Sequence, residues 1–282
     1  MKSIPLPAGT LIPTLGLGTW RLGESSARRA TEVAAVRSAI EIGYRLIDTA
    51  EMYGEGAAEE VVGQAIAEAL RAGDVHRDEL FVVSKVYPHN ASRRGTLQAC
   101  ERSRRRLGLD RIDLYLLHWR GEHPLADTVA AMHALVDAGR IAHWGVSNFD
   151  VDDMEELMAA GPGCAMNQVY FSLGERGPEF SLLPWLRAHG IPLMAYSPID
   201  QAALSRHGVL EAIGRRLGIS AAQVALAWLL RADGVVAIPK AAQKAHLHDN
   251  LAAAELSLDT AALTAIDHSF APPRCRSALA MN

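Results

Sequence analysis

Three ionisable residues and one tyrosine stand where short apolar runs of the chain end. Asp48, Lys85 and His118 each lie at or just beyond such an end, and Tyr53 follows Asp48 closely. A phenol, with a pKa of about 10, is a poor proton donor near neutrality, but a neighbouring ammonium group stabilises the phenolate and lowers that pKa. Lys85 would supply this charge, Asp48 would hold the ammonium group, and His118 would hydrogen-bond a substrate oxygen. The set predicts proton transfer to a carbonyl oxygen.

Each of these residues also has a structural interpretation. Asp48 and Lys85 would form an ion pair inside the fold, Tyr53 would pack in a loop, and His118 would be a hydrogen-bonded structural histidine. Lys85 would also serve as the nucleophile of a Schiff base. Their joint placement at the ends of apolar runs favours the catalytic interpretation. No H-E-x-x-H spacing occurs in the sequence, and we predict no metal site.

Eight apolar runs recur along the chain, with helix-length segments between them. The runs are Leu15–Leu17, Leu46–Ile47, Leu80–Val83, Ile112–Leu117, Ile141–Val146, Ala165–Val169, Ile191–Ala195 and Val235–Ile238. Consecutive Val, Ile and Leu residues are typical of strands covered on both faces in a parallel sheet. Eight strand-helix alternations without a linker predict an α/β fold, a (β/α)8 TIM barrel forming a single domain over residues 1–282. An open doubly wound sheet is the alternative.

A barrel of this class has its active site at the carboxyl ends of the strands, where polar residues follow the runs. In chain order these are Thr19, Asp48, Lys85, His118, Ser147, Gln168, Tyr196 and Lys240. Ile4–Pro13 has apolar residues on both sides of Gly9 and predicts a hairpin that closes one barrel end. Ala221–Leu230, preceded by Ser220, and Asp259–His268 predict two helices additional to the repeat.

Composition excludes several classes of protein. Of 282 residues, 49% are hydrophobic and 21% are charged, which excludes a disordered chain, and the formal net charge of −4 offers no basic footprint for nucleic acid. The apolar stretch Ala221–Leu230 is half as long as a membrane span needs. The first ten residues lack the apolar core of a signal peptide, and three scattered cysteines argue against a disulfide framework. We expect a cytoplasmic monomer that binds no membrane.

The order of the motifs resembles the aldo/keto reductase family. Gly43–Ala50 followed by Met52–Gly54 resembles the first signature of that family, and Ile238–Lys240 resembles the last. Between them, in family order, come Val83–Lys85, Leu116–Trp119, Gly145–Asn148, Asn167–Gln168 and Ala195–Pro198. The resemblance extends from Gly16 to Asn250. It implies an NADPH-dependent carbonyl reductase of barrel fold, with Tyr53 as proton donor and Asp48, Lys85 and His118 completing a catalytic tetrad.

The resemblance also implies where the cofactor binds. Ser147, Asn148 and Gln168 would hold the carboxamide, and the Tyr196 ring would stack on the nicotinamide. The further cofactor contacts that it implies are Thr19, Trp20, Asp48, Ser197, Pro198, Ile199, Lys240, His246, Asp249 and Asn250. No G-x-G-x-x-G motif occurs, because Gly16-Leu-Gly18 lacks the third glycine, so a Rossmann-type phosphate loop is not predicted.

Two residues depart from members of the family that select strongly for NADPH. Ala241 follows Lys240 where Ser or Thr is usual, and His246 stands where Arg is usual. An arginine holds a phosphate by a bidentate, always charged contact, whereas an imidazole, with a pKa of about 6.5, is mostly neutral at pH 7. NADPH stays the expected cofactor because of Lys240, but we expect weakened selectivity against NADH.

The substrate site is predicted from aromatic residues beside the tetrad. Trp20, Tyr87 and Trp119 would form its wall together with His118. The loops Arg120–His123 and Ile199–Arg206 and the tail Arg274–Asn282 are short, which predicts a shallow, open mouth. Such a mouth favours small aldehydes and dicarbonyls over steroids. The segments Glu51–Glu55, Ser84–Pro88 and Ala271–Leu279 resemble a bacterial methylglyoxal-reducing subgroup.

Two other functions remain open from the residues alone. One is a non-catalytic NADPH-binding regulatory subunit, because a barrel can bind a nucleotide without turnover. The other is a lyase that uses Lys85 as a Schiff base. The basic run Glu101–Arg106 is interpreted as a solvated helix face rather than a nucleic-acid site.

Overall fold

The computed structural model describes residues 2–281, so the two terminal residues of the predicted single domain lie outside it. Within this range eight strands form one parallel sheet, each strand pairing with the next along the chain. They are β3 (Leu17–Gly18), β4 (Leu46–Asp48), β5 (Phe81–Val86), β6 (Ile112–Leu117), β7 (Ile141–Ser147), β8 (Cys164–Tyr170), β9 (Leu193–Tyr196) and β10 (Val235–Ala237). Each predicted apolar run contributes one strand.

The sheet closes between its first and last strands. Leu15, just before β3, forms a parallel bridge with Ala237 of β10. The Gly16 amide donates to the Ala237 carbonyl at 2.9 Å, and the Ala237 amide donates to the Thr14 carbonyl at the same distance. This closure confirms the predicted barrel and excludes the open sheet.

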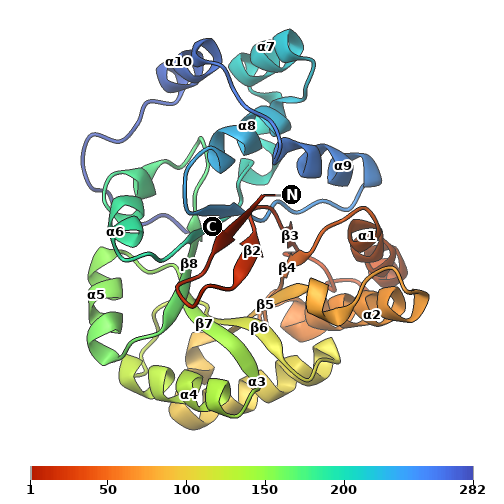
Figure 1. The fold of residues 1–282 in the computed structure, drawn as a ribbon, viewed down its shortest axis with the longest axis vertical. Helices are drawn as coiled ribbons and strands as arrows, with labels where there is room; N and C mark the ends of the chain where they lie inside the picture. The colour runs from red at the N-terminus through yellow and green to blue at the C-terminus, as the bar shows by residue number, and fades with distance from the viewer. Residues whose placement is uncertain (1, 282) are drawn as a thin grey trace.

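Helices surround the strands, as Figure 1 shows. They are α1 (Arg29–Glu41), α2 (Ala57–Ala72), α3 (Arg93–Leu107), α4 (Leu125–Asp137), α5 (Val151–Ala160), α6 (Leu182–Ala188), α8 (Ala221–Leu230) and α9 (Lys244–Ala253). Helix α3 illustrates how the sequence sets their limits. Its first turn is capped by the Ser92 hydroxyl, which accepts from the Gly95 amide at 3.1 Å, and it ends at Gly108 in the left-handed region (φ 64°).

Side chains fill the inside of the barrel in alternation along each strand. Leu46, Val83, Leu114, Leu116, Met166, Met194 and Val236 belong to one buried cluster there. A larger cluster packs the outer faces of the strands against the helices. The strands are therefore apolar on both faces, as parallel strands covered on both sides must be.

The predicted hairpin is present at the start of the chain. Strands β1 (Ser3–Pro5) and β2 (Leu11–Pro13) pair in antiparallel register, and Gly9 in the turn has φ 86°. Leu6 and Ile12 are buried in the same cluster as the inner barrel side chains. The hairpin, red in Figure 1, therefore covers one end of the barrel.

Two helices of the described range lie outside the strand-helix repeat, which is the predicted number. Only one of the two is a helix that was predicted to be additional. They are α7 (Gly208–Leu217) and α10 (Thr260–Ser269), which lie together away from the barrel (Figure 1). Helix α8, which was expected to be additional, packs on β10 instead. It is buried on nearly every side because the barrel covers one face and α7 another. A helix apolar all round is typical of such a layer.

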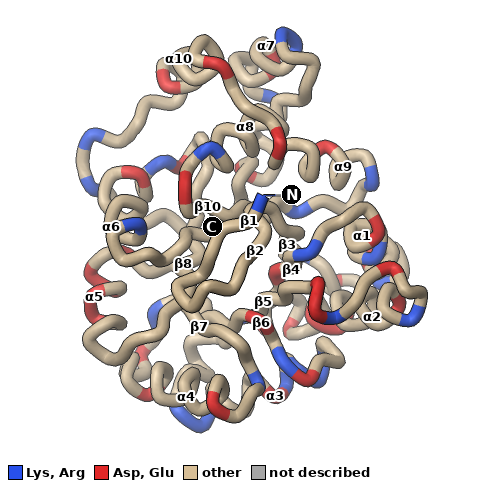
Figure 2. Tube along the Cα trace, viewed as in Figure 1, with Lys and Arg blue, Asp and Glu red and all other residues tan. Residues whose placement is uncertain are grey.

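Charged side chains are distributed over the outer helices, with both signs interspersed (Figure 2). Cys100 and Cys164 are buried and Cys275 is exposed, and all three are free thiols. None of the helices in residues 2–281 combines the length and the apolar character that crossing a bilayer requires.

Candidate active site

The strand alternation itself places the ionisable residues in the barrel mouth. Inner side chains recur at every second position, so Asp48 follows Leu46 on the inner face of β4 and Lys85 follows Val83 on β5. His118 continues the inner series of β6 by the same rule. All three therefore point towards the axis at the carboxyl ends of neighbouring strands.

Lys85 is the centre of a buried hydrogen-bonded cluster. Its side chain is fully buried, and its Nζ donates to both carboxylate oxygens of Asp48 at 2.9 and 2.7 Å and to the Thr49 carbonyl at 2.8 Å. The Tyr53 hydroxyl oxygen lies 3.3 Å from the same nitrogen. These contacts occupy the donors of Lys85, and two of the three acceptor residues, Asp48 and Tyr53, line the pocket.

Tyr53 comes from a tight turn between β4 and α2. Residues Tyr53–Gly56 form a short 3-10 segment in which Gly54, Glu55 and Gly56 all have positive φ. The Tyr53 ring meets the His118 ring edge-on, with 5.8 Å between centroids. The phenol is thus held between Lys85 and His118, as the sequence predicts.

Burial governs the ionisation of the pair beneath the phenol. It raises the pKa of Asp48 and lowers the pKa of Lys85, and the attraction between the two groups opposes both changes. Burial likewise lowers the pKa of His118 well below its ordinary value, and the nearby Lys85 charge acts in the same direction. His118 is therefore a neutral imidazole at physiological pH, and its Nδ1 has no hydrogen-bond partner among the described residues.

The pKa of Tyr53 was expected to be lowered by Lys85, and this prediction was wrong. Its pKa is raised well above the ordinary value, first because the hydroxyl is buried and second because of the Asp48 carboxylate. The Asp48 carboxylate lies closer to the Lys85 ammonium group than the Tyr53 hydroxyl does. The Asp48–Lys85 ion pair therefore presents little net positive charge to the phenol. Tyr53 is consequently a fully protonated phenol near neutrality.

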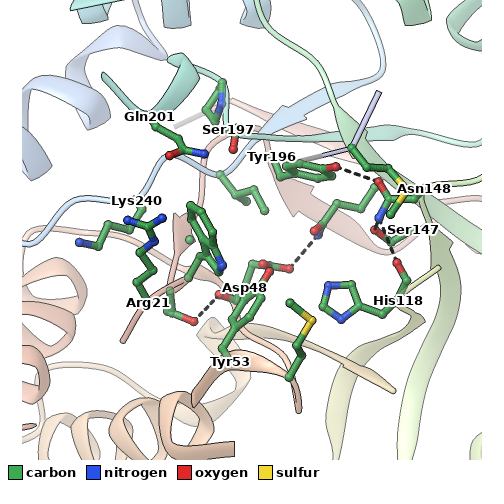
Figure 3. Close-up of a pocket in the computed structure, with 18 of the residues that line it drawn as sticks. Arg21, Asp48, Tyr53, His118, Ser147, Asn148, Tyr196, Ser197, Gln201 and Lys240 are labelled. Atoms are coloured by element: carbon green, nitrogen blue, oxygen red, sulfur yellow. Dashed lines mark hydrogen bonds between the residues drawn. The ribbon is translucent and has the colours of Figure 1, made fainter. Parts of the chain in front are cut away.

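A pocket of about 380 Å³ adjoins this cluster at the barrel mouth. The predicted cofactor and substrate residues that line it are Thr19, Trp20, Asp48, Tyr53, His118, Trp119, Ser147, Asn148, Gln168, Tyr196, Ser197, Pro198, Ile199 and Lys240. Figure 3 shows His118, Ser147 and Asn148 on one side of the pocket and Lys240 on the other. Of the eight residues that follow the apolar runs, all but Lys85 line the pocket.

Hydrogen bonds fix the side of the pocket beside the phenol (Figure 3). The Tyr196 hydroxyl donates to Asn148 Oδ1 at 2.9 Å, and Asn148 Nδ2 donates to the Ser147 hydroxyl at 3.1 Å and to the His118 carbonyl at 3.0 Å. Gln168 Nε2 donates to Asp48 Oδ1 at 2.8 Å. The Asn148 backbone amide also donates to the Gln168 carbonyl at 2.8 Å, so the residues predicted to bind the carboxamide and those predicted to transfer the proton form one continuous network.

Besides Lys85, which lies beneath Tyr53, four predicted site residues do not line the pocket. Tyr87 meets the Trp119 ring edge-on, with 5.8 Å between ring centroids, and is not among the lining residues. His246 and Asp249 are exposed on α9, and Asn250 is buried on its inner side. These three remain predictions for the distant end of a long cofactor.

Several residues that line the pocket were not predicted from the sequence. They are Gly18, Arg21, Met52, Gln201, Ala202, Ile238 and Met281. Arg21 lies over the Trp20 ring at 4.4 Å, and its position directly after Thr19 and Trp20 is a signal that would have found it. Met281 had no such signal because it comes from the end of the chain.

The short C-terminal tail contributes a residue to the pocket wall. The tail returns across α5, where Arg276 pairs with Asp150 at 2.9 Å and with Asp152 at 3.0 Å, and it brings Met281 to the pocket. Its last residue lies outside the described residues. A short tail therefore still forms part of the wall, because ion pairs direct its course.

The fold and the site together define a (β/α)8-barrel enzyme with a buried Asp, Lys, Tyr and His cluster beside an amide-lined pocket. The model of the Aldo/keto reductase family matches residues 14–270, and this chain belongs to that family. It is 47% identical over 287 residues to methylglyoxal reductase YeaE of Escherichia coli (strain K12), with 99% of each chain covered. It is 39% identical over 249 residues to glyoxal reductase of Bacillus subtilis (strain 168), which covers 88% of this chain and 85% of the relative.

A solved structure shares the same arrangement. The aldo/keto reductase from Klebsiella pneumoniae, in complex with NADP and acetate, superposes with a TM-score of 0.94 and 45% identity. The match covers 100% of this chain and 99% of the other.

Proposed function

We propose that this chain is an NADPH-dependent reductase of small aldehydes and dicarbonyls, methylglyoxal among them, with Tyr53 as proton donor. The observation that carries the proposal is the Tyr53 hydroxyl, 3.3 Å from a buried Lys85 ammonium group and bordering the pocket. Membership of the aldo/keto reductase family and the printed activities of the relatives support it.

The residues of the cluster divide the work of proton transfer. Tyr53 donates its proton to the carbonyl oxygen, so the phenol O–H bond breaks as the new O–H bond of the alcohol forms. Lys85 stabilises the phenolate left behind, and Asp48 keeps the ammonium group charged and in place. His118, neutral at physiological pH, donates a hydrogen bond that orients the carbonyl group.

The pocket lining fits a nicotinamide dinucleotide. Reduced nicotinamide, when bound, supplies the hydride for carbonyl reduction. The Ser147 hydroxyl and the Asn148 and Gln168 amides provide the donors and acceptors that a carboxamide requires, and Tyr196 offers a flat ring beside them. At the opposite side, Lys240 supplies a positive charge for phosphate groups.

The proposal on cofactor selectivity rests on the residues expected to face the phosphates of the cofactor. Lys240 and His246 are both exposed, and Ala241 offers no hydroxyl between them. One lysine acts as a point charge rather than the planar fork of an arginine, so it favours a 2′-phosphate without strong geometric selection. We therefore propose that NADPH is preferred and that NADH is also accepted.

The size and chemistry of the pocket support a small substrate. Trp20, Trp119, Met52 and Met281 provide its apolar wall, while Tyr53 and His118 converge on one polar point. The nicotinamide would share the cavity of about 380 Å³ with the substrate, so only part of that volume is available to the substrate. This supports aldehydes and dicarbonyls of a few carbon atoms.

The same geometry argues against a lyase that uses Lys85 as a Schiff base. A nucleophilic amine needs a free lone pair and access to the carbonyl carbon. Lys85 is fully buried, donates to Asp48 and Thr49, and has Tyr53 between it and the pocket. No contact in the described residues specifically favours a regulatory subunit without turnover.

The proposal extends to the state of the protein in the cell. We propose that the chain is one domain and acts as a monomer in the cytoplasm. The family match over residues 14–270 supports one domain, and three unpaired cysteines fit a reducing compartment. Analytical ultracentrifugation showing a stable dimer would contradict the monomer.

The experiment that tests the function compares two phenols. Loss of reduced-nicotinamide absorbance is followed with NADPH and methylglyoxal for the parent, Tyr53→Phe and Tyr87→Phe. Tyr87 is the matched control because it sits on the next loop and does not line the pocket. We expect Tyr53→Phe to lower kcat by about 10³-fold with NADPH binding unchanged, and Tyr87→Phe to lower it less than about threefold. Turnover that survives in Tyr53→Phe would defeat the proposal.

A further inference from the structure

Composition predicted that the basic run Glu101–Arg106 of α3 is a solvated face, and the structure agrees only in part, because two of its arginines pair with buried carboxylates. Arg102 and Arg106, one helical turn apart, both reach back to buried carboxylates on the segment that follows β4. Arg102 Nη2 lies 2.6 Å from Glu51 Oε1, and Arg106 Nη1 lies 3.0 Å from Glu59 Oε2. The two acidic residues flank Tyr53 in the sequence. Arg105, between them, is 77% exposed and pairs with Glu101 on its own helix.

Glu51 connects the Tyr53 loop to the chain that follows Lys85. Its carboxylate accepts from the Tyr87 amide at 3.2 Å and from Asn90 Nδ2 at 3.2 Å, besides Arg102. Its own amide donates to the Lys85 carbonyl at 3.2 Å. The Glu51 side chain is only 7% exposed, so these partners supply the hydrogen bonds that water would otherwise make.

Glu59 makes the second connection, behind the catalytic lysine. Its side chain is completely buried and accepts from the Ser84 hydroxyl at 2.5 Å and from Arg106. Ser84 precedes Lys85 in β5, on the opposite face of the strand. Glu59 therefore attaches the start of α2 to the strand that carries the ammonium group.

Gly56 shows how closely Arg106 approaches the loop. A Cβ at this position would overlap the Arg106 guanidinium, and the φ of 93° is one that other residues rarely adopt. Nothing but glycine allows the turn and the arginine to occupy their places together. The loop from Glu51 to Glu59 is thus held at both ends and touched in the middle by one face of α3.

We propose that Arg102 and Arg106 are positioning residues, which hold the Tyr53 hydroxyl against Lys85 by clamping Glu51 and Glu59. The inference rests on the proposed reductase function. Positioning matters because a displacement of about 1 Å at a reacting group can cost a factor of 10² in rate. The clamp acts on the proton donor and has no contact with the amide-binding side of the pocket.

The first arm of the test is kinetic. Arg102→Gln and Arg106→Gln are compared with Arg105→Gln, the exposed arginine on the same helix. We expect kcat to fall about tenfold in the first two variants, with KM and the Kd of NADPH within about twofold of the parent, and no change in Arg105→Gln. The solvent deuterium isotope effect on kcat rises because proton transfer becomes slower. Arg102→Lys, which restores one donor to Glu51, recovers part of the loss.

The second arm does not depend on turnover. Amide hydrogen exchange of residues 49–56 is measured in the same variants. The Glu51 and Tyr53 amides, bonded to Lys85 and Ala50, exchange about tenfold faster without the clamp and at the parental rate in Arg105→Gln. If Arg102→Gln does not fold, Glu51→Gln removes the charge from the other side of the same pair and gives the same readouts.

The outcomes separate the clamp from the function. A parent without turnover defeats the reductase proposal, and the exchange arm still decides whether the arginines hold the loop. Exchange and kcat equal to those of Arg105→Gln overturn the clamp. So does a loss of kcat accompanied by equally weakened NADPH binding and an unchanged solvent isotope effect, because that describes general destabilisation.

Discussion

The two sides of the pocket differ in how the chain holds them. Beside the phenol, buried side chains such as Asp48 and Lys85 are joined in one hydrogen-bonded network on strand ends. On the opposite side, Lys240 is exposed at the end of β10, and Gln201 and Ala202 have positive φ in the loop after β9. Under the proposed function, the proton transfer is carried by buried residues at the strand ends, and cofactor selectivity is left to exposed side chains. The following predictions test this division.

The largest effect is expected at the buried pair. Lys85→Met removes the cation and leaves the Asp48 carboxylate buried without its partner, which destabilises the fold by about 3–5 kcal/mol. We expect kcat to fall by at least about 10³-fold, as for loss of the proton donor itself. The measurements are urea denaturation and NADPH oxidation with methylglyoxal.

The control for this variant separates stability from chemistry. Adding Asp48→Asn to Lys85→Met removes the orphaned charge, so most of the lost stability returns while kcat stays low. If kcat returned together with stability, Lys85 would be a structural residue and the buried side would lose its catalytic interpretation.

A moderate effect is expected at the exposed side. His246→Arg supplies the planar, charged fork that a 2′-phosphate prefers, so the Kd of NADPH should tighten about tenfold, or about 1.4 kcal/mol, while that of NADH stays within about twofold. His248→Arg is the matched control, because it is also exposed on α9 but two residues further on, and points elsewhere. Fluorescence titration with both cofactors measures the ratio.

Two outcomes would contradict the proposed cofactor selectivity. A parent that already prefers NADPH by more than about 10³-fold, or 4 kcal/mol, would show that another group performs the arginine's task. An equal gain in His248→Arg would show that added charge, rather than geometry, matters.

The smallest effect is expected from pH. The active forms are the protonated Tyr53, whose pKa is raised, and the neutral His118, whose pKa is lowered. The raised pKa of Tyr53 moves the loss of activity by deprotonation to higher pH. The lowered pKa of His118 moves the loss of activity by protonation to lower pH. We therefore expect kcat for reduction to vary less than about twofold between pH 6.5 and 9, within the ordinary values of about 6.5 and 10 for these groups. A midpoint inside that window would contradict either assignment.

The strand-end residues were predictable because the barrel repeats one geometric rule. Asp48, Lys85, His118 and Gln168 all fall on inner positions of parallel strands, and inner positions alternate along the sequence. Their convergence follows from topology and needs no knowledge of loops. The hairpin was also predictable, because apolar residues lie on both sides of a turn at Gly9.

Other features depend on burial and on long-range packing, which spacing does not encode. The pKa of Tyr53 was predicted in the wrong direction because desolvation and the Asp48 charge outweigh Lys85. Arg102 was interpreted as a solvated residue because its buried partner lies on a segment 51 positions away. Tyr87 packs against Trp119 outside the pocket, and Met281 reaches the pocket from a tail in which Arg276 pairs with Asp150.

The most direct test of the central claim is a single turnover. The parent, Tyr53→Phe and Tyr87→Phe are loaded with NADPH and mixed with excess methylglyoxal, and the loss of NADPH fluorescence is followed before product release. We predict the rate for Tyr53→Phe to be lower than that of Tyr87→Phe by about 10³-fold, with equal NADPH bound at the start. Equal rates for the two variants would contradict the assignment of Tyr53 as the proton donor.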